Sequence, residues 1–183
     1  MPEQEMVRDW RRMAKFAALV VLVAGVAFLV GLYGVAPSLA RGGDAYVPAA
    51  LAAMPPAVVQ VTNPDGTTAL LVVRLAETAD ARTAGLRGVG LRVLDAKLLL
   101  YAHPREQTVR TTYNMEGIRA PLELAIIGAD GTVVAIRKVA MGTQSVDVTE
   151  RHRWVLAAQD GLFRHLGIAV GSKLDPATIR KLR

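Results

Sequence analysis

The chain has 183 residues, a formal net charge of +6 and a hydrophobic fraction of 52%. It contains no cysteine, which excludes disulfide bonds, thiolate nucleophiles and zinc or iron–sulfur centres with cysteine ligands. Basic residues are spread along the sequence, and only 5% of residues are aromatic. A nucleic-acid-binding surface normally concentrates basic side chains with aromatic ones between them, so we expect no nucleic-acid partner.

The longest apolar stretch, residues 16–36, carries no charged side chain. As an α-helix it would span roughly 30 Å, the thickness of the hydrocarbon core of a bilayer. Backbone polar groups in lipid must be satisfied within their own segment, so we expect a transmembrane helix here. The chain then divides into a basic tail (1–15), the transmembrane helix (16–36), a Gly/Pro/Ala-rich linker (37–56) and a β-rich outer domain (57–183).

The orientation of this helix follows from the charges beside it. Arg8, Arg11, Arg12 and Lys15 precede the apolar stretch, and the positive-inside rule places such a flank in the cytoplasm. We therefore expect a bacterial inner-membrane protein with a periplasmic outer domain. A cleaved signal peptide, with its cleavage site after Ala40, is the alternative. The apolar stretch exceeds the roughly 7–15 residues of a signal sequence, which favours an uncleaved anchor.

Small and aromatic residues suggest how this helix is held. Ala27 and Gly31 are four positions apart, a spacing that lets a second membrane helix approach closely, although a purely lipid-facing anchor is the alternative. Trp10, Tyr33 and Tyr46 flank the apolar stretch at the positions where interfacial aromatic residues are common.

After the linker the hydrophobic pattern changes to a period of two, which predicts short strands. Two turn signals, Asn63-Pro64-Asp65-Gly66 and Asp130-Gly131, predict hairpins. The strands are expected at residues 58–61, 68–75, 98–101, 108–113, 122–127, 132–136, 145–148, 154–157 and 168–170. A loop containing His103 and Pro104 should join the third and fourth of them.

Three short helices accompany these strands. The first is expected over residues 79–84 with Thr78 as its N-cap, the second over residues 160–166, and the third after Asp175-Pro176. The fold class is therefore mainly β (α+β): a compact antiparallel β-barrel or sandwich-like domain with two or three peripheral helices.

Between Leu71 and Leu174 the chain carries a series of short motifs in a fixed order. They are Gly85-Leu86, Lys97–Tyr101, Tyr113–Ile118 with Pro121-Leu122-Glu123, Asp130-Gly131, Trp154-Val155-Leu156 and Gly167–Gly171. This order resembles the bacterial and archaeal family called domain of unknown function 192. The resemblance implies a small, mostly antiparallel β fold with peripheral helices, and it supplies no reaction.

The chain departs from that family at its polar positions. Arg87 replaces the methionine that follows Gly-Leu in the family. Where the family has Trp-Met-Lys-Asn-Thr, this chain has Asn114, Met115, Glu116, Gly117 and Ile118, so only the methionine is kept. Ala157 replaces the glutamate of the Tyr-Val-Leu-Glu strand. This pattern is typical of a descendant that keeps the framework and has lost the polar surface.

No residue set has the spacing of a known catalytic or metal site. His103, His152 and His165 lack the i, i+2 or i, i+4 spacing of a preformed metal pair. Glu116, Glu123 and Asp130 are candidate carboxylates for acid/base work, but Asp130 is explained by its turn. Ser145, Asp147 and His152 resemble a hydrolase set in composition but lack a nucleophile turn, and Gly85–Gly90 lacks the spacing of a nucleotide-binding loop.

The function that we expect from the sequence is that of a non-catalytic accessory or scaffold subunit of a larger membrane assembly, such as a respiratory or photosynthetic complex. Its partners would be membrane subunits and the bilayer, with no metal or cofactor. The alternative is a membrane-tethered periplasmic module that binds a small ligand such as a sugar or peptide. Its groove would be lined by Arg87, Tyr113, Asn114, Met115 and Glu116. A periplasmic hydrolase is the third and least supported alternative.

Overall fold

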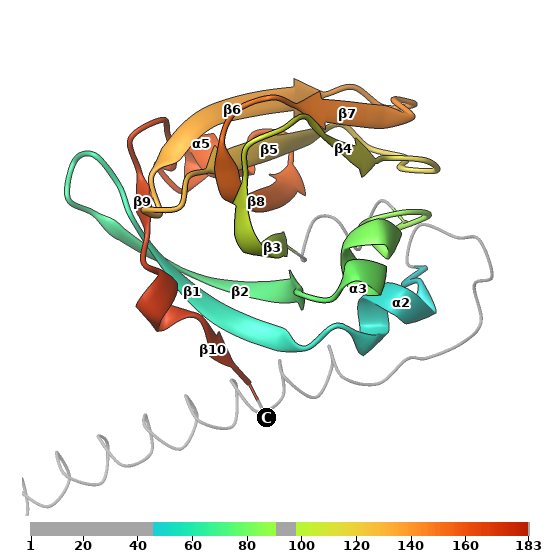
Figure 1. The fold of residues 1–183 in the computed structure, drawn as a ribbon, viewed down its shortest axis with the longest axis horizontal. Helices are drawn as coiled ribbons and strands as arrows, with labels where there is room; N and C mark the ends of the chain where they lie inside the picture. Colours follow the sequence, from blue (N-terminus) through green and yellow to red (C-terminus); the bar gives the residue numbers. More distant parts are fainter. Residues whose placement is uncertain (1–45, 91–97, 183) are drawn as a thin grey trace, which may run out of the picture. The chain divides into compact units, whose positions relative to one another are not determined.

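The structure is a computed structural model that describes residues 46–90 and 98–182, and β strands dominate it (Figure 1). The strands are β1 (Pro56–Thr62), β2 (Thr68–Ala76), β3 (Leu98–Gln107), β4 (Thr111–Asn114), β5 (Leu122–Ile127), β6 (Val133–Val139), β7 (Ser145–Val148), β8 (His152–Gln159), β9 (Lys173–Leu174) and β10 (Arg180–Lys181). The helices are α2 (Ala49–Ala53), α3 (Ala79–Ala84), α5 (Leu162–His165) and the 3₁₀-helix η1 (Pro176–Thr178).

The expected transmembrane helix and its residues Trp10, Ala27, Gly31 and Tyr33 lie outside the described residues. Within the described part of the chain, no helix has both the length and the apolar character needed to cross a bilayer.

The main sheet has the strand order β10-β1-β2-β3-β8-β5-β6. All neighbouring strands pair antiparallel except β2 and β3, which run parallel. This parallel pair departs from the expected antiparallel sheet, and it arises because α3 lies between the two strands and returns the chain to the same end. Strands β4 and β7 form a separate two-stranded ribbon.

The sheet curls into a half-barrel because β9 joins its two ends. Leu174 pairs with Val61 of β1, while its N–H donates to the carbonyl of Gly131 in the turn before β6 (2.8 Å). The Val133 N–H donates to Ser172 just before β9 (2.8 Å). The described domain is therefore mainly β, with a curled half-barrel sheet and a few short helices.

Apolar side chains cover both faces of the central strands. All six residues of β5 are buried, with alternate side chains entering two separate clusters. One cluster gathers side chains of β1, β2 and β9 around Phe163 of α5. The other cluster packs α2, the ribbon and the loop that follows β4 against β3 and β8. Burying each large apolar side chain contributes ~1.5–3 kcal/mol, so both faces of the sheet stabilise the fold.

Local sequence signals predicted several elements correctly. The strands at 122–127 and 145–148 and the helix at 79–84 have the expected bounds. Thr78 caps that helix by accepting a hydrogen bond from the Ala81 N–H (3.2 Å). At the Asp130-Gly131 turn, the Asp130 carboxylate accepts a hydrogen bond from the Thr132 N–H (3.0 Å).

Two other expectations were wrong. His103 and Pro104 belong to β3, which continues to Gln107 opposite His152 after a bulge that accommodates the proline. Residues 168–170 form no strand, because the Ile168 N–H donates to the Phe163 carbonyl (2.8 Å) and closes the end of α5. The last helix is reduced to η1, whose N-cap Asp175 accepts from the Ala177 N–H (2.9 Å) as expected.

Part of the expected linker packs on the domain. Leu51 and Met54, in and after α2, are buried in the cluster that also contains the ribbon residues. Arg74 of β2 holds the end of this helix, since its Nη1 donates to the Met54 carbonyl (2.8 Å). Residues that precede β1 in the chain therefore help to cover this face of the sheet.

We predict that Gly131→Ala destabilises the domain more than Gly142→Ala. Both glycines have a positive φ, which costs an alanine ~1–2 kcal/mol. A Cβ at Gly131 would also overlap the Leu174 carbonyl, whereas a Cβ at Gly142 would meet nothing within 4 Å. Thermal unfolding should show a clearly larger loss for G131A. Equal losses would mean that β9 does not hold the two ends of the sheet together.

Candidate functional site

The main polar cluster of the described domain joins three strands. Tyr113 is the inward-facing residue of β4, buried between two exposed neighbours. His103 lies on β3 and His152 at the start of β8, and the Tyr113 hydroxyl lies 2.8 Å from Nε2 of each. The two imidazole ring centres are 5.5 Å apart. We call these three residues the His–Tyr–His cluster.

The hydrogen bonds fix where the protons lie when all three groups are neutral. Nδ1 of His152 is 2.7 Å from the Glu150 carbonyl, which can only accept, so this nitrogen carries the proton. Nε2 of His152 then accepts from the Tyr113 hydroxyl, whose oxygen accepts from Nε2–H of His103. The cluster is thus a one-way chain from His103 through Tyr113 and His152 to the backbone.

Burial determines the ionisation of this cluster. His103 is half-buried, and burial lowers its pKa to about 4, assisted by the nearby Arg82 and His152. Burial also raises the pKa of the Tyr113 hydroxyl. At neutral pH His103 and Tyr113 are therefore uncharged. A base with a pKa near 4 is poorly matched to proton transfer at neutral pH, so the geometry favours a structural role for this chain of bonds.

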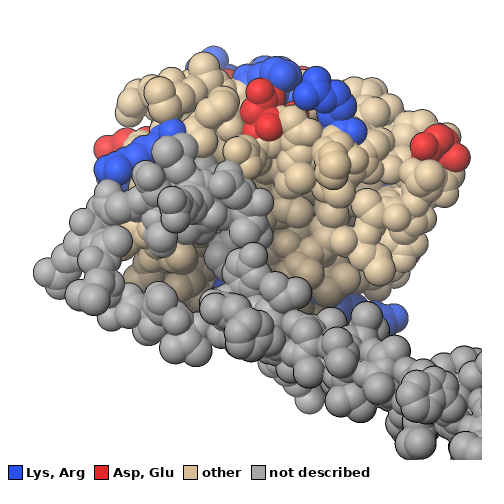
Figure 2. All heavy atoms as spheres, turned by 180° about the vertical axis from the view of Figure 1, so that it is seen from behind, with Lys and Arg blue, Asp and Glu red and all other residues tan. Residues whose placement is uncertain are grey.

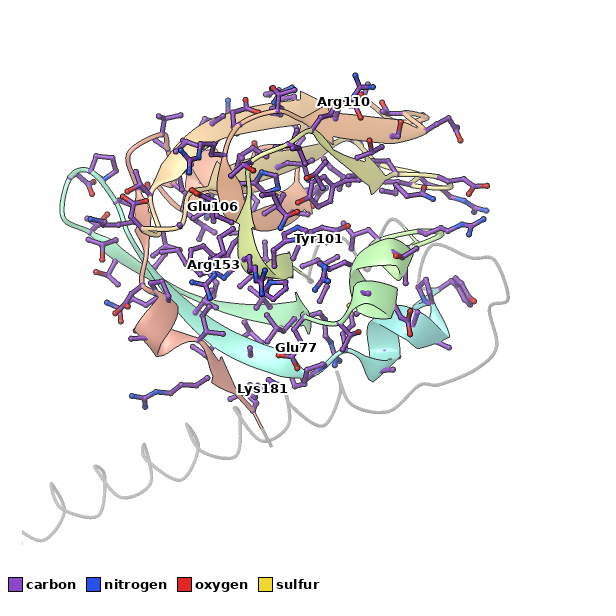
Figure 3. The ribbon with its side chains drawn as sticks, viewed as in Figure 1. Glu77, Tyr101, Glu106, Arg110, Arg153 and Lys181 are labelled. Carbon is purple, nitrogen blue, oxygen red and sulfur yellow. The ribbon has the colours of Figure 1, made fainter. Side chains whose placement is uncertain are left out.

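Tyr101 of β3 is buried on the side of that strand that faces α3 (Figure 3). Its ring packs edge-on against that of Tyr113, with ring centres 5.0 Å apart. Its hydroxyl lies close to the backbone of Leu86 but makes no hydrogen bond of normal geometry, and burial raises its pKa. Arg82 of α3 lies beside the cluster, because its Nη1 donates to the carbonyl of Ala102, the residue before His103 (3.0 Å).

The five residues predicted to line a ligand groove fall into two groups. Arg87 and Glu116 form an exposed ion pair (2.7 Å), and the Asn114 side chain accepts from the Glu116 N–H (2.8 Å). Tyr113 and Met115 are buried in the apolar cluster beside the ribbon. The buried pair and the exposed set therefore do not line one groove.

The predicted carboxylates have structural partners. Glu123 is buried, and its Oε1 accepts from the Phe163 N–H (2.6 Å) at the start of α5. The carboxylate of Asp130 binds Thr132, which lowers its pKa. Neither group is free to act on a substrate.

Ser145, Asp147 and His152 do not form a hydrolase triad in the described structure. Asp147 instead accepts from the Thr112 hydroxyl (2.6 Å) and pairs with Arg110 (2.9 Å). Both nitrogens of His152 are already bound. Within residues 46–90 and 98–182, no three His, Asp or Glu side chains converge as a metal site would require.

Sequence spacing did not reveal the His–Tyr–His cluster. Tyr113 is 10 residues from His103 and 39 from His152, and only the β3–β8 register brings the two histidines together. The one available signal was the single Tyr in the alternating segment 111–114, which marks an inward-facing polar group. His165 lies apart from the cluster, exposed on α5.

A separate cavity of about 280 Å³ lies between α2, α3 and β2. Its walls are mainly apolar, with two carboxylates among them. They are formed by Ala50, Ala53, Met54, Pro55, Leu75, Glu77, Thr78, Asp80 and Ala81. None of the predicted groove residues lines it.

We predict that Tyr113→Phe destabilises the domain by ~1–3 kcal/mol, because it leaves Nε2 of the buried His152 without a partner. Tyr101→Phe is the matched control: it also removes a buried hydroxyl, but one without a hydrogen bond. We expect this control to be neutral or slightly stabilising. Denaturant unfolding compares the two, and equal effects would contradict the proton arrangement derived above.

We also predict that the domain loses stability as the pH falls from about 6.5 to about 4. In this range the unfolded chain protonates His103 while the folded chain does not, so protons favour unfolding. His103→Gln should lose less stability than wild type over the same range. The exposed His165 provides the control, since His165→Gln should keep the wild-type pH dependence in thermal unfolding. The same slope in all three proteins would contradict the prediction.

Comparisons with known proteins agree with this fold. The model of the family DUF192, described as Uncharacterized ACR, matches residues 60–176. A search of the curated proteins found no match.

Two solved structures are similar in fold. One is a candidate transcription regulator from Sinorhizobium meliloti 1021, with a TM-score of 0.60 and 24% identity over 68% of this chain and 96% of that one. The other is a protein of unknown function from Novosphingobium aromaticivorans DSM 12444, with a TM-score of 0.54 and 24% identity over 71% of this chain and 98% of that one. At this identity the likeness concerns the fold alone. The family match confirms the resemblance seen in the motif order, and the chain belongs to the DUF192 family.

Proposed function

We propose that this chain is a membrane-tethered, non-catalytic accessory subunit whose β domain serves for contact rather than chemistry. In the described domain the candidate polar groups contact one another: the His–Tyr–His cluster forms a one-way chain of hydrogen bonds, and Arg87 pairs with Glu116. Two positions that are polar in the family also support this proposal. They are occupied here by Ala157 and Ile118, and both side chains are buried.

The observation that carries the proposal is a pair of apolar side chains on the outward face of a strand. Leu70 and Val72 of β2 have exposed fractions of 71% and 60%, although β2 belongs to the main sheet. The outer face of a half-exposed antiparallel strand is normally polar, and exposed apolar patches commonly mark contact sites.

We define the outer hairpin face by five residues: Val58, Leu70, Val72, Arg74 and Arg180. Val58 lies opposite Val72 on β2 and opposite Arg180 on β10, so these three side chains share one face. Arg74 and Leu70 follow at intervals of two along β2. The face combines apolar side chains with two cations.

The membrane tether is the second part of the proposal and rests on the uncharged stretch 16–36. With the basic residues on its N-terminal side, the β domain would lie on the periplasmic side of a bacterial inner membrane. The proposed partners are subunits of a larger assembly, contacted by the helix and by the domain. The proposal includes no nucleic-acid partner, and in the view of Figure 2 acidic and basic side chains both lie along the upper margin of the domain.

The binding of a small ligand is a second candidate function, and the cavity between α2 and α3 favours it. Its volume of about 280 Å³ is close to the lower limit for ligand pockets, ~300 Å³. Glu77 already pairs with Lys181, so the apolar walls together with Asp80 would suit a small amphipathic cation better than a sugar.

We expect the full chain, tagged at its C-terminus and purified from its native membranes in a gentle detergent, to migrate with a fixed set of larger membrane proteins. Native gels and mass spectrometry measure this. Migration as a free chain of 19.6 kDa would contradict the accessory role. In that case, binding of small amines to the cavity, with Asp80→Asn as the variant, would test the second candidate.

A further inference from the structure

We infer that the outer hairpin face rests on the headgroup layer of an anionic bilayer. This inference depends on the proposed function, because it names the surface that a tethered β domain would contact. It concerns strands β10, β1 and β2, which lie side by side along the lower edge of the domain in Figure 1.

The composition of this face fits a lipid headgroup layer. The outward positions of β1 and β2 are occupied by apolar, hydroxyl, amide and basic side chains, with no carboxylate among them. Leu182, 45% exposed, extends the apolar part, since its N–H donates to the Pro56 carbonyl (2.8 Å) and keeps it beside β1. Shallow apolar side chains flanked by arginines are typical of surfaces that bind anionic lipids.

The neighbouring carboxylates are held away from this face. Asp65 lies in the turn beyond β1, where Thr67 binds its carboxylate and lowers its pKa. Glu77 follows β2 and pairs with Lys181 (Figure 3). Lys181 lies opposite the buried Ala57, so its side chain starts from the other face of β10. The net charge of the outer hairpin face therefore comes from the exposed Arg180 and from Arg74, whose Nη1 also donates to the Met54 carbonyl.

In the proposed arrangement, a short linker keeps the domain near the bilayer. Nine residues, 37–45, separate the uncharged stretch from Tyr46, and a fully extended chain of that length spans at most roughly 30 Å. A tether this short raises the effective lipid concentration at the domain surface. A contact that would be too weak in free solution is then sufficient.

Two other occupants fit this face less well. A stable protein interface buries about 800 Å² on each partner, with 20–30 residues a side, whereas this face offers three apolar side chains, two arginines and the adjoining Leu182. If a second copy of the chain paired with this face in a two-fold manner, both sides of the interface would carry the same two arginines and no carboxylate to oppose them. A lipid surface requires neither a large area nor an opposite protein charge.

The test uses the full chain, which has no native cysteine, so that one introduced cysteine can carry a fluorescent label. Leu70→Cys and Val72→Cys report on the outer hairpin face. Val134→Cys on β6, also an exposed apolar position, is the matched control. Each labelled protein is reconstituted into vesicles of phosphatidylcholine and phosphatidylglycerol that contain a lipid with a nitroxide near its headgroup.

We expect several-fold stronger quenching at positions 70 and 72 than at position 134. The difference should shrink when phosphatidylglycerol is replaced by phosphatidylcholine, or when Arg180→Glu is added. Thermal unfolding of each variant checks that the domain is intact.

Equal, weak quenching at all three positions in a membrane-bound chain would overturn the inference. Co-migration with larger membrane proteins would then still support the accessory role, with a protein on this face. A full chain that stays in solution with the vesicles present would overturn both. Quenching confined to positions 70 and 72 in a chain that migrates alone would support the lipid contact and reject the accessory role.

Discussion

The two residues of β9 hold together a sheet whose strands come from almost the whole domain. Leu174 pairs with β1 on one side and donates to the Gly131 carbonyl on the other, so both ends of the sheet depend on the same short segment. The apolar cluster around Phe163 fills the inside of the curl that this closure creates. Without it the end of β1 and the turn before β6 would expose unpaired N–H and C=O groups, because β10 covers only Ala57 and Val58 of β1.

The opposite face of the sheet has a different cover. The β4–β7 ribbon contributes apolar side chains such as Met115 and also Tyr113, which carries a hydroxyl into the interior. Burying a hydroxyl is costly unless it is hydrogen-bonded, and the two histidines provide both a donor and an acceptor for it. The Tyr113 hydroxyl and the two imidazoles thus attach the ribbon to the sheet.

Features set by neighbouring residues could be predicted from the sequence. Thr78 and Gly85 delimit α3, and Asp130-Gly131 makes a hairpin, because each acts on a backbone only a few residues away. Contacts between distant segments could not be predicted in this way. The pairing of β3 with β8 depends on a bulge after Ala102, and no sequence period reveals where a bulge places the next side chain.

The candidate groove shows the same limit. An extended backbone turns alternate residues to opposite faces, and Tyr113 is buried whereas Glu116 is exposed. The resemblance to the family identified the β fold, but it carried no information on which polar side chains would contact one another.

The closure of the sheet also has a consequence for the order of folding. Gln60 of β1 donates to Thr178, 118 residues later in the chain, and Arg180 pairs directly with Val58. The sheet is therefore complete only after β1 has paired with residues far away along the chain, and such distant pairings form slowly. Until then the β1–β2 hairpin exposes its buried face as well as its apolar outer one, and exposed apolar strands of this kind favour aggregation.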